Sequence, residues 1–97
     1  MKLKIVRKKA ENNFLHFTLA GEMTVYSAGK LKDVLLNELK SCSGITIDLA
    51  EIDEADTSGF QLLLFLKREA ANLGKSFRIT EMSSRLRNIF NLYKEIV

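Results

Sequence analysis

The order of strand-like and helix-like segments is the feature of this 97-residue chain that most constrains its fold. Two strand-like segments come first, at residues 2–6 and 14–20, and the turn-forming residues 11–13 between them favour a hairpin. Helical and strand-like segments then alternate to the end. Because parallel neighbours need a crossover, usually a helix, this alternation predicts parallel pairing. We expect one α/β domain over residues 1–97, with a mixed four-stranded sheet and about three helices mainly on one face.

Two different patterns of apolar residues predict the first helix and the strand after it. Residues 21–26 are predicted to be a loop, and Ser27 is a plausible cap for the helix that follows. The expected buried stripe of this helix is Leu31, Val34, Leu35 and Leu39. The β-branched run at residues 45–49 then predicts a buried strand.

The second half of the chain predicts two more helices with a strand between them. The central helix opens at about Phe60 and ends at Gly74, a favourable C-terminal residue. Its expected inner face is Leu62, Leu63, Leu66, Ala70 and Leu73. Residues 77–80 form the fourth strand, and Ser83 or Ser84 caps the last helix. That helix should bury Leu86, Ile89, Phe90 and Tyr93.

Composition limits the class of protein, the partners and the cellular compartment that we expect. The chain is 46% hydrophobic and 28% charged, as ordinary globular proteins are. Its net charge of +3 comes without the dense basic stripe of a nucleic-acid binder, so no nucleic-acid partner is expected. The apolar run at residues 62–66 is too short for membrane insertion. One cysteine, Cys42, and no signal-peptide pattern favour the reducing cytoplasm.

Residue types that serve catalysis or metal binding do not occur in the required arrangements. The acidic residues Asp48, Glu51, Asp53, Glu54 and Asp56 crowd one short stretch. Their spacing does not fit a calcium loop, which favours solvated loop acids over a metal site. The single histidine, His16, lies in a predicted strand, where we expect it to be partly exposed. We therefore expect no enzyme activity, no metal and no cofactor.

Thr57 and Ser58 stand apart, because they lie where a strand meets a very apolar helix. Free N–H groups and the positive dipole end at a helix start favour an oxygen anion, so a phosphate could be held there. The alternative is that one hydroxyl simply caps the helix, which is worth about 1 kcal/mol. Capping alone does not explain the polar neighbours Asp56, Gly59 and Gln61.

The stretch from Asp56 to Leu63, DTSGFQLL, resembles the signature of the STAS domain, the family of anti-sigma-factor antagonists. The segment GEMT at residues 21–24 resembles the family's Gly-Glu-hydrophobic-Asp motif, and the element order matches along the whole chain. The resemblance implies a regulatory module that binds an anti-sigma kinase and is released by phosphorylation. By position, it makes Thr57 the phosphoacceptor, with Ser58 second.

The resemblance also implies a partner-binding surface around the phosphoacceptor. Asp56 would shape the acceptor site, and Thr24 and Tyr26 would border the partner. The remaining residues predicted for this surface are Glu22, Gly59, Phe60 and Gln61. Two positions depart from the usual pattern: Thr24 stands where many antagonists have Asp, and Thr57 replaces the commoner Ser.

Several partner classes follow from this resemblance. The first is an anti-sigma factor of the serine/threonine kinase type. Another is a chemotaxis or two-component signalling protein, because small STAS proteins of similar motif accompany those systems. The alternative is an ABC ATPase, with the chain as a constitutive accessory subunit of a lipid transporter and Thr57 as a contact. Nucleotide binding, known for some members, ranks lower because no Gly-rich phosphate loop is present.

Overall fold

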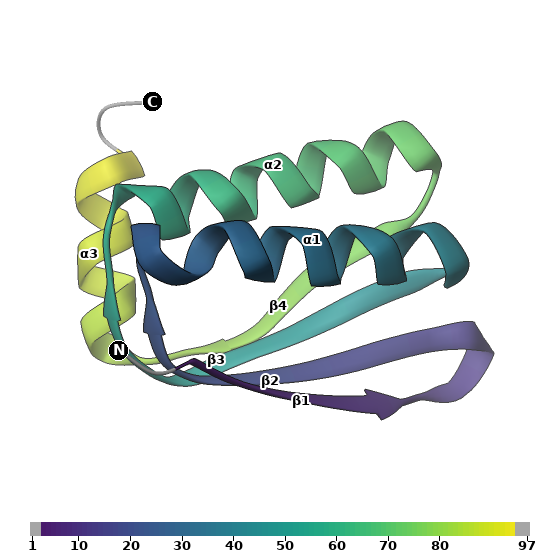
Figure 1. The fold of residues 1–97 in the computed structure, drawn as a ribbon, viewed down its shortest axis with the longest axis horizontal. Helices are drawn as coiled ribbons and strands as arrows, with labels where there is room; N and C mark the ends of the chain where they lie inside the picture. The colour runs from purple at the N-terminus through teal and green to yellow at the C-terminus, as the bar shows by residue number, and fades with distance from the viewer. Residues whose placement is uncertain (1–2, 95–97) are drawn as a thin grey trace.

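A computed structural model of the chain describes residues 3–94, with side chains described up to residue 91. Within these residues, four strands form one mixed sheet in the order β1-β2-β3-β4, and three α-helices accompany it (Figure 1). The elements are β1 (Leu3–Lys9), a 3-10 turn (Glu11–Asn13), β2 (Phe14–Met23), α1 (Val25–Ser41), β3 (Gly44–Ala55), α2 (Thr57–Leu73), β4 (Ser76–Met82) and α3 (Ser84–Lys94). The predicted fold class is confirmed.

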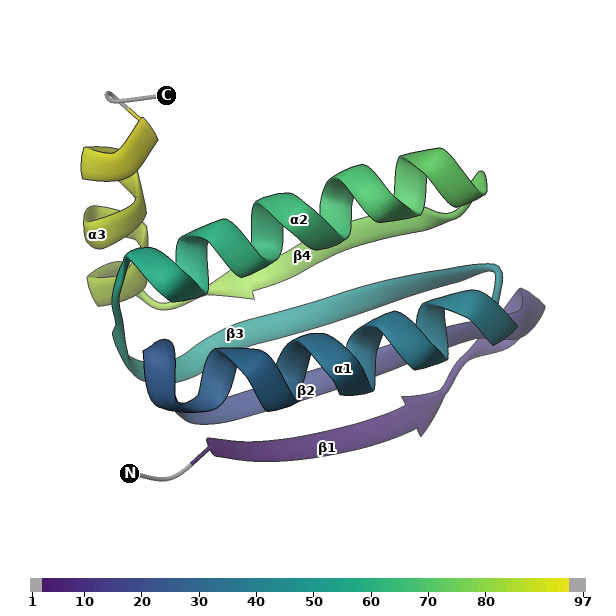
Figure 2. The same ribbon diagram turned by 45° about the horizontal axis from the view of Figure 1, so that its top comes forward.

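Strand pairing follows the predicted pattern. β1 and β2 form an antiparallel hairpin, while β2–β3 and β3–β4 pair in parallel. The helices α1 and α2 are the crossovers, and they lie side by side on one face of the sheet (Figures 1 and 2). Both helices begin at the same end of the sheet, where α3 also stands. This arrangement brings the chain segments after β2 and β3 together.

The core lies between the sheet and the two crossover helices. In β2, alternate residues Leu15, Phe17 and Leu19 are buried, and β3 buries Ile45 and Ile47. The predicted stripes of α1 and α2 face them, and the buried members are Leu31, Leu35, Leu39, Leu62, Leu63, Leu66 and Ala70. Each of these side chains larger than alanine contributes about 1.5–3 kcal/mol by leaving water.

One residue of the predicted α2 stripe lies outside the core. Leu73 is 43% exposed, so its predicted burial is wrong. It belongs to the last helical turn, where Gly74 takes a left-handed conformation with φ of 71° and turns the chain toward β4. That turn confirms Gly74 as the helix end.

The start of α1 differs from the sequence-based prediction. The predicted loop at residues 21–26 is wrong, because β2 continues to the buried Met23 and α1 begins at Val25. The cap is Thr24, and Ser27 occupies the third helical position. Ser27 Oγ accepts a hydrogen bond from Thr24 N at 3.1 Å, which is the reciprocal half of a capping box. Ser27 therefore supports the helix start from inside the first turn.

The strand β3 is much longer than predicted. It continues from the apolar run to Ala55, so Glu51, Asp53 and Glu54 lie on an exposed strand end instead of in a loop. Parallel pairing with β2 extends to Met23 and Ala55 and overrides the low strand propensity of Asp and Glu. Register shifts between Thr18 and Ala20 and between Gly21 and Glu22 mark irregular points in this pairing.

The last helix, α3, begins as one of the two predicted alternatives. Ser83 precedes it, and its Oγ accepts a hydrogen bond from Leu86 N at 3.1 Å. Leu86 and Phe90 are buried and Ile89 is half-buried, as predicted. The side chain of Tyr93, the fourth residue of that predicted stripe, lies outside the described side chains.

Candidate functional site

The predicted site residues gather at the end of the sheet where α1 and α2 begin. Met23 and Ala55 are register partners at the carboxyl ends of the parallel strands β2 and β3. The next residues along the two strand–helix connections, Thr24 and Asp56, are therefore neighbours although 32 positions separate them in the sequence. We call this region, comprising residues 24–27 and 56–61, the helix-start surface.

Asp56 holds the two helix starts together. Its Oδ1 accepts hydrogen bonds from Ser58 N at 2.9 Å and Gly59 N at 3.3 Å, which caps α2. Its Oδ2 accepts a hydrogen bond from Val25 N at 3.0 Å, in the first turn of α1. Gly59 N also donates to the main-chain oxygen of Asp56 at 3.0 Å, whereas Ser58 N and Val25 N belong to the first helical turns, whose N–H groups lack intrahelical partners. A carboxylate is favoured by both helix dipoles. The alternative that Thr57 or Ser58 caps α2 is therefore wrong, because Asp56 is the cap.

Thr57 occupies the first helical position of α2 and is exposed. Its hydroxyl makes no hydrogen bond to any residue that the structure describes, whereas the Asp56 carboxylate is fully engaged. Ser58 follows in the same turn and is half-buried. Of the two predicted phosphoacceptors, Thr57 is thus the more accessible. No hydrogen bond among the described residues depends on its hydroxyl.

Two side chains in the first turn of α1 are strongly exposed. Tyr26 is 86% exposed and Val25 is 60% exposed, although both belong to the first turn of a helix. Thr24 is half-buried, and its Oγ1 accepts a hydrogen bond from Tyr26 N at 3.3 Å. Sequence analysis missed Val25 because it assigned this segment to a loop. The Thr-x-x-Ser spacing from Thr24 to Ser27 was the signal that could have located the helix start.

Gly59 lies beneath the surface and is buried. A Cβ atom added there would lie 2.5 Å from the main-chain oxygen of Met23, a distance that real Cβ atoms do not reach. Glycine at this position therefore lets the first turn of α2 pack directly on the end of β2. Gly59 therefore has a packing role in the structure.

The remaining predicted residues differ in their exposure and in what they contact. Gln61 is exposed, while Glu22 is half-buried and its main-chain oxygen accepts a hydrogen bond from Ser27 Oγ at 2.8 Å. Phe60 is half-buried and packs edge-to-face on Phe90 of α3, with ring centroids 5.1 Å apart. The helix-start surface thus unites Thr24, Tyr26, Asp56, Thr57 and Gln61, while Phe60 turns toward α3.

The charges near this surface are mainly negative. Glu54, at the end of β3, pairs with Arg85 of α3 at 2.9 Å, but both side chains are at least half exposed, which limits the pair to about 0–1 kcal/mol. The Asp56 carboxylate already occupies the helix dipole ends. A phosphate on Thr57 would therefore share this terminus with a carboxylate and would make it strongly anionic.

The described residues hold no group of three or more His, Cys, Asp or Glu side chains that could bind a metal ion. His16 lies half-buried in β2, as expected, with its Nδ1 2.6 Å from Thr46 Oγ1 of β3. Cys42 is buried at the end of α1, and its Sγ donates to Gly44 O at 3.4 Å. None of the described helices has the length and apolar character to cross a membrane.

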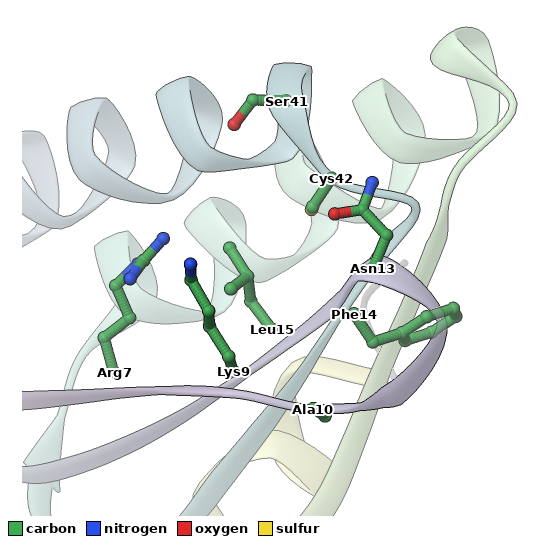
Figure 3. A pocket seen from close by; sticks show the side chains of 8 residues that line it. All are labelled: Arg7, Lys9, Ala10, Asn13, Phe14, Leu15, Ser41 and Cys42. Atoms are coloured by element: carbon green, nitrogen blue, oxygen red, sulfur yellow. The ribbon is translucent and has the colours of Figure 1, made fainter.

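A small hollow lies at the opposite end of the sheet, between the hairpin and the end of α1. Its volume is about 240 Å³. Figure 3 shows Arg7 and Lys9 extending from β1 toward α1, with Cys42 and Ser41 above them. Arg7 forms an ion pair with Glu38 of α1, and Asn13 donates a long hydrogen bond to Ser43 Oγ at 3.4 Å. These polar groups have partners within the fold, so the hollow is a weaker candidate than the helix-start surface.

Comparison with known proteins gives a family and a fold. A family model described as Mlab, STAS domain, matches residues 6–94. The anti-sigma factor antagonist SpoIIAA in its unphosphorylated form is 15% identical, with a TM-score of 0.79 over 94% of this chain and 81% of SpoIIAA. SpoIIAA of Bacillus in the phosphorylated form is 15% identical, with a TM-score of 0.75 over 93% and 83% of the two chains.

A third similar structure is an anti-sigma factor antagonist from Mycobacterium paratuberculosis. It is 14% identical, with a TM-score of 0.82 over 97% of this chain and 80% of that protein. At such identities the likeness establishes a common fold. No curated protein matches the chain by sequence.

Proposed function

The chain belongs to the STAS domain family, and we propose that it is a regulatory protein-binding module whose partner docks on the helix-start surface. The observation that carries this proposal is that the helix-start surface presents an exposed Thr57 hydroxyl, with no hydrogen bond to any described residue, and the 86% exposed Tyr26. Tyrosine is enriched among the residues that contribute most to binding at protein interfaces. Neither side chain is needed to complete the helix starts, because Asp56 and Thr24 supply the caps.

The proposed control of binding is phosphorylation of Thr57, with Ser58 as the second acceptor. A phosphate adds about −1.5 to −2 charges. At about 6 Å from a partner carboxylate, in an effective dielectric of about 20, repulsion reaches about 5 kcal/mol before screening. Even about 3 kcal/mol would weaken binding about a hundredfold. The switch needs no refolding, since the added charge acts directly at the interface.

The proposed partner is an anti-sigma factor of the kinase type or a related signalling protein. Support comes from the likeness to anti-sigma factor antagonists, one of which, SpoIIAA, is known in unphosphorylated and phosphorylated forms. In this proposal the chain is a substrate and ligand of its partner and performs no catalysis itself. Thr24, at the position where many antagonists have Asp, would then tune which kinase is recognised.

The first test is intact-mass analysis and phosphosite mapping of the protein from its native cells, with phosphatase inhibitors present. We expect a species heavier by about 80 Da, modified at Thr57 or Ser58. Calorimetry with the co-purified partner should then show that Thr57→Glu weakens binding while the melting temperature stays unchanged. Asn72→Glu, which adds the same charge at an exposed position near the other end of α2, is the matched control. Equal partner affinity of wild type, Thr57→Glu and authentic phosphoprotein would refute the switch.

A second candidate is a constitutive accessory subunit that contacts an ABC ATPase. The observation that favours it is the completeness of the site: Asp56 satisfies both helix starts without any phosphate, which leaves Thr57 available as a simple contact. Co-purification with an ATPase and absence of phosphorylation across growth conditions would support this candidate. In that case Thr57→Glu would still weaken the complex, but phosphatase treatment would not change it.

A further inference from the structure

We propose that a groove between α2, β4 and α3 binds an acidic amphipathic helix of a partner protein. This α2–α3 groove has a volume of about 470 Å³, about twice that of the hollow beside the hairpin. Its lining residues come from all three elements and are Phe60, Leu63, Leu64, Lys67, Phe77, Ile79, Met82, Arg87, Phe90 and Asn91. The inference extends the proposed binding function to a second surface and rests on that function.

The shape of the groove suits a helix. Its α2 wall consists of Phe60, Leu63, Leu64 and Lys67, which follow the i, i+3, i+4, i+7 spacing of one helix face. Seven residues of helix extend about 10 Å, or two turns. A bound helix would present its own apolar residues at the same spacing, so the two faces can interlock as packed helices do.

The groove also exposes apolar surface that the fold itself leaves uncovered. Ile79 on β4 is 37% exposed, and Phe77, Met82 and Leu64 are only half-buried. These residues belong to an edge strand and the outer side of α2, because β4 is the last strand of the sheet. A covering helix would remove this surface from water, at about 25 cal/mol per Å².

The charge of the lining selects the chemistry of the occupant. Lys67 and Arg87 are its charged members, and none of the described lining residues is acidic. Arg87 Nη2 donates to Met82 O at 3.3 Å, which holds this cation at the α3 rim. A partner helix with Glu or Asp beside its apolar stripe would meet one cation on each side, which favours it over a neutral or basic helix.

The groove is continuous with the helix-start surface. Phe60, which lines the groove, lies one turn after Thr57 on α2. A single partner can therefore contact the helix-start surface with one segment and place a helix in the groove with another. The groove itself contains neither Thr57 nor Tyr26, so binding there can be tested separately from the switch.

The test uses a synthetic, fluorescein-labelled amphipathic helical peptide with Leu at i, i+3, i+4 and i+7 and Glu at flanking positions. A matched peptide carries Lys in place of Glu. Fluorescence anisotropy should show saturable binding of the Glu peptide and at least about tenfold weaker binding of the Lys peptide.

Charge reversal on α2 sharpens this test. Lys67→Glu should weaken the Glu peptide about tenfold and strengthen the Lys peptide, whereas Arg68→Glu should change either affinity less than about twofold. Arg68 is the neighbouring exposed cation on the same helix and lies outside the groove lining. Ile79→Glu should abolish binding of the Glu peptide, and circular dichroism checks that each variant keeps its fold.

Several outcomes would overturn the inference. Equal affinity for the Glu and Lys peptides, or unchanged binding by Ile79→Glu, would remove the groove as a helix site. Saturable binding of laurate in place of the peptide would assign the groove to a small amphipathic anion. A concentration-dependent dimer that Ile79→Glu dissociates would assign it to a second copy of the chain. Thr57→Glu should leave peptide affinity unchanged, so failure of the phosphorylation switch and failure of the groove are distinguishable.

Discussion

At both ends of the α1–α2 layer, side chains satisfy main-chain groups that the helices leave unpaired, but the two ends differ in the side chains that they expose. At the far end, Lys75 Nζ donates to Cys42 O at 2.6 Å and to Lys40 O at 3.4 Å, which satisfies carbonyls where α1 ends. At the near end, Asp56 satisfies N–H groups of both helices. The near end alone adds an 86% exposed tyrosine and a free threonine hydroxyl.

This difference separates stability from function. A polar group that satisfies a buried partner is explained by folding alone. An exposed aromatic ring gains little from its position in the free protein, and Tyr26 belongs to the surface where we propose that the partner docks. Substitutions at the two ends should accordingly divide into those that change stability and those that change binding.

The largest expected effect is on stability, at Gly59. Gly59→Ala would force a Cβ into the main-chain oxygen of Met23, and we expect a loss of about 3 kcal/mol in the free energy of unfolding. Urea denaturation measures it. Gly29→Ala is the matched control, because a Cβ at Gly29 meets nothing within 4 Å and should stabilise α1 by about 0.5–1 kcal/mol. Equal effects at both glycines would contradict the close packing of α2 on β2.

The next effect concerns the cap that joins the two helices. Asp56→Ala removes acceptors from N–H groups of α1 and α2, and we expect a loss of about 2 kcal/mol in unfolding free energy. Asp53→Ala, at an exposed position on β3, should stay within about 0.5 kcal/mol of wild type. A neutral Asp56→Ala result would show that the carboxylate is available for a partner and does not hold the helix starts.

A smaller effect should fall on binding alone. Tyr26→Ala should weaken the partner complex about tenfold, or about 1.4 kcal/mol, while the melting temperature stays the same. Val6→Ala, which truncates an exposed apolar side chain on β1, is the control and should leave affinity unchanged. Calorimetry with the co-purified partner measures both. If the two variants behave alike, the helix-start surface is not the docking site.

The smallest effect is expected at the far end. Lys75→Met keeps the aliphatic stem but removes the donor to Cys42 O, so we expect a loss of about 1 kcal/mol in unfolding free energy and no change in partner affinity. Chemical denaturation and calorimetry on the same sample report the two quantities. A clear loss of affinity would mean that the partner reaches both ends of the helix layer. The far end would then contribute to binding as well as to stability.

Element types and order were predictable because each depends on local periodicity. The leucine spacing around Leu31 and Leu35 predicts a helix, and the β-branched run from Ile45 predicts a strand. Each prediction depends only on a few neighbouring residues. Element ends were less predictable. The acidic half of β3 has little strand propensity of its own and becomes strand through pairing with β2. The start of α1 lies earlier than the sequence predicts, because Thr24 is the cap and Ser27 is the third helical residue.

The candidate site divides in the same way. Asp56 and Thr57 could be selected from the sequence, because hydroxyls and an acid beside an apolar helix form a local pattern, whereas Tyr26 was implied only by the resemblance to the STAS family. That Asp56 also caps α1 could not be selected, since Val25 is 31 positions away in the chain. The α2–α3 groove was equally hidden, because its lining comes from three elements that are each unremarkable alone.

The sequence by itself determined the types and order of the strands and helices and the crossover topology, since each follows from residue types a few positions apart. Tertiary structure decided which helix starts share a carboxylate, which glycine must lack a Cβ and which apolar residues line an open groove. The physical reason is the separation along the chain of the residues that interact. Periodicity and capping act within a turn or a strand, whereas these contacts form only when parallel pairing brings distant segments to the same end of the sheet.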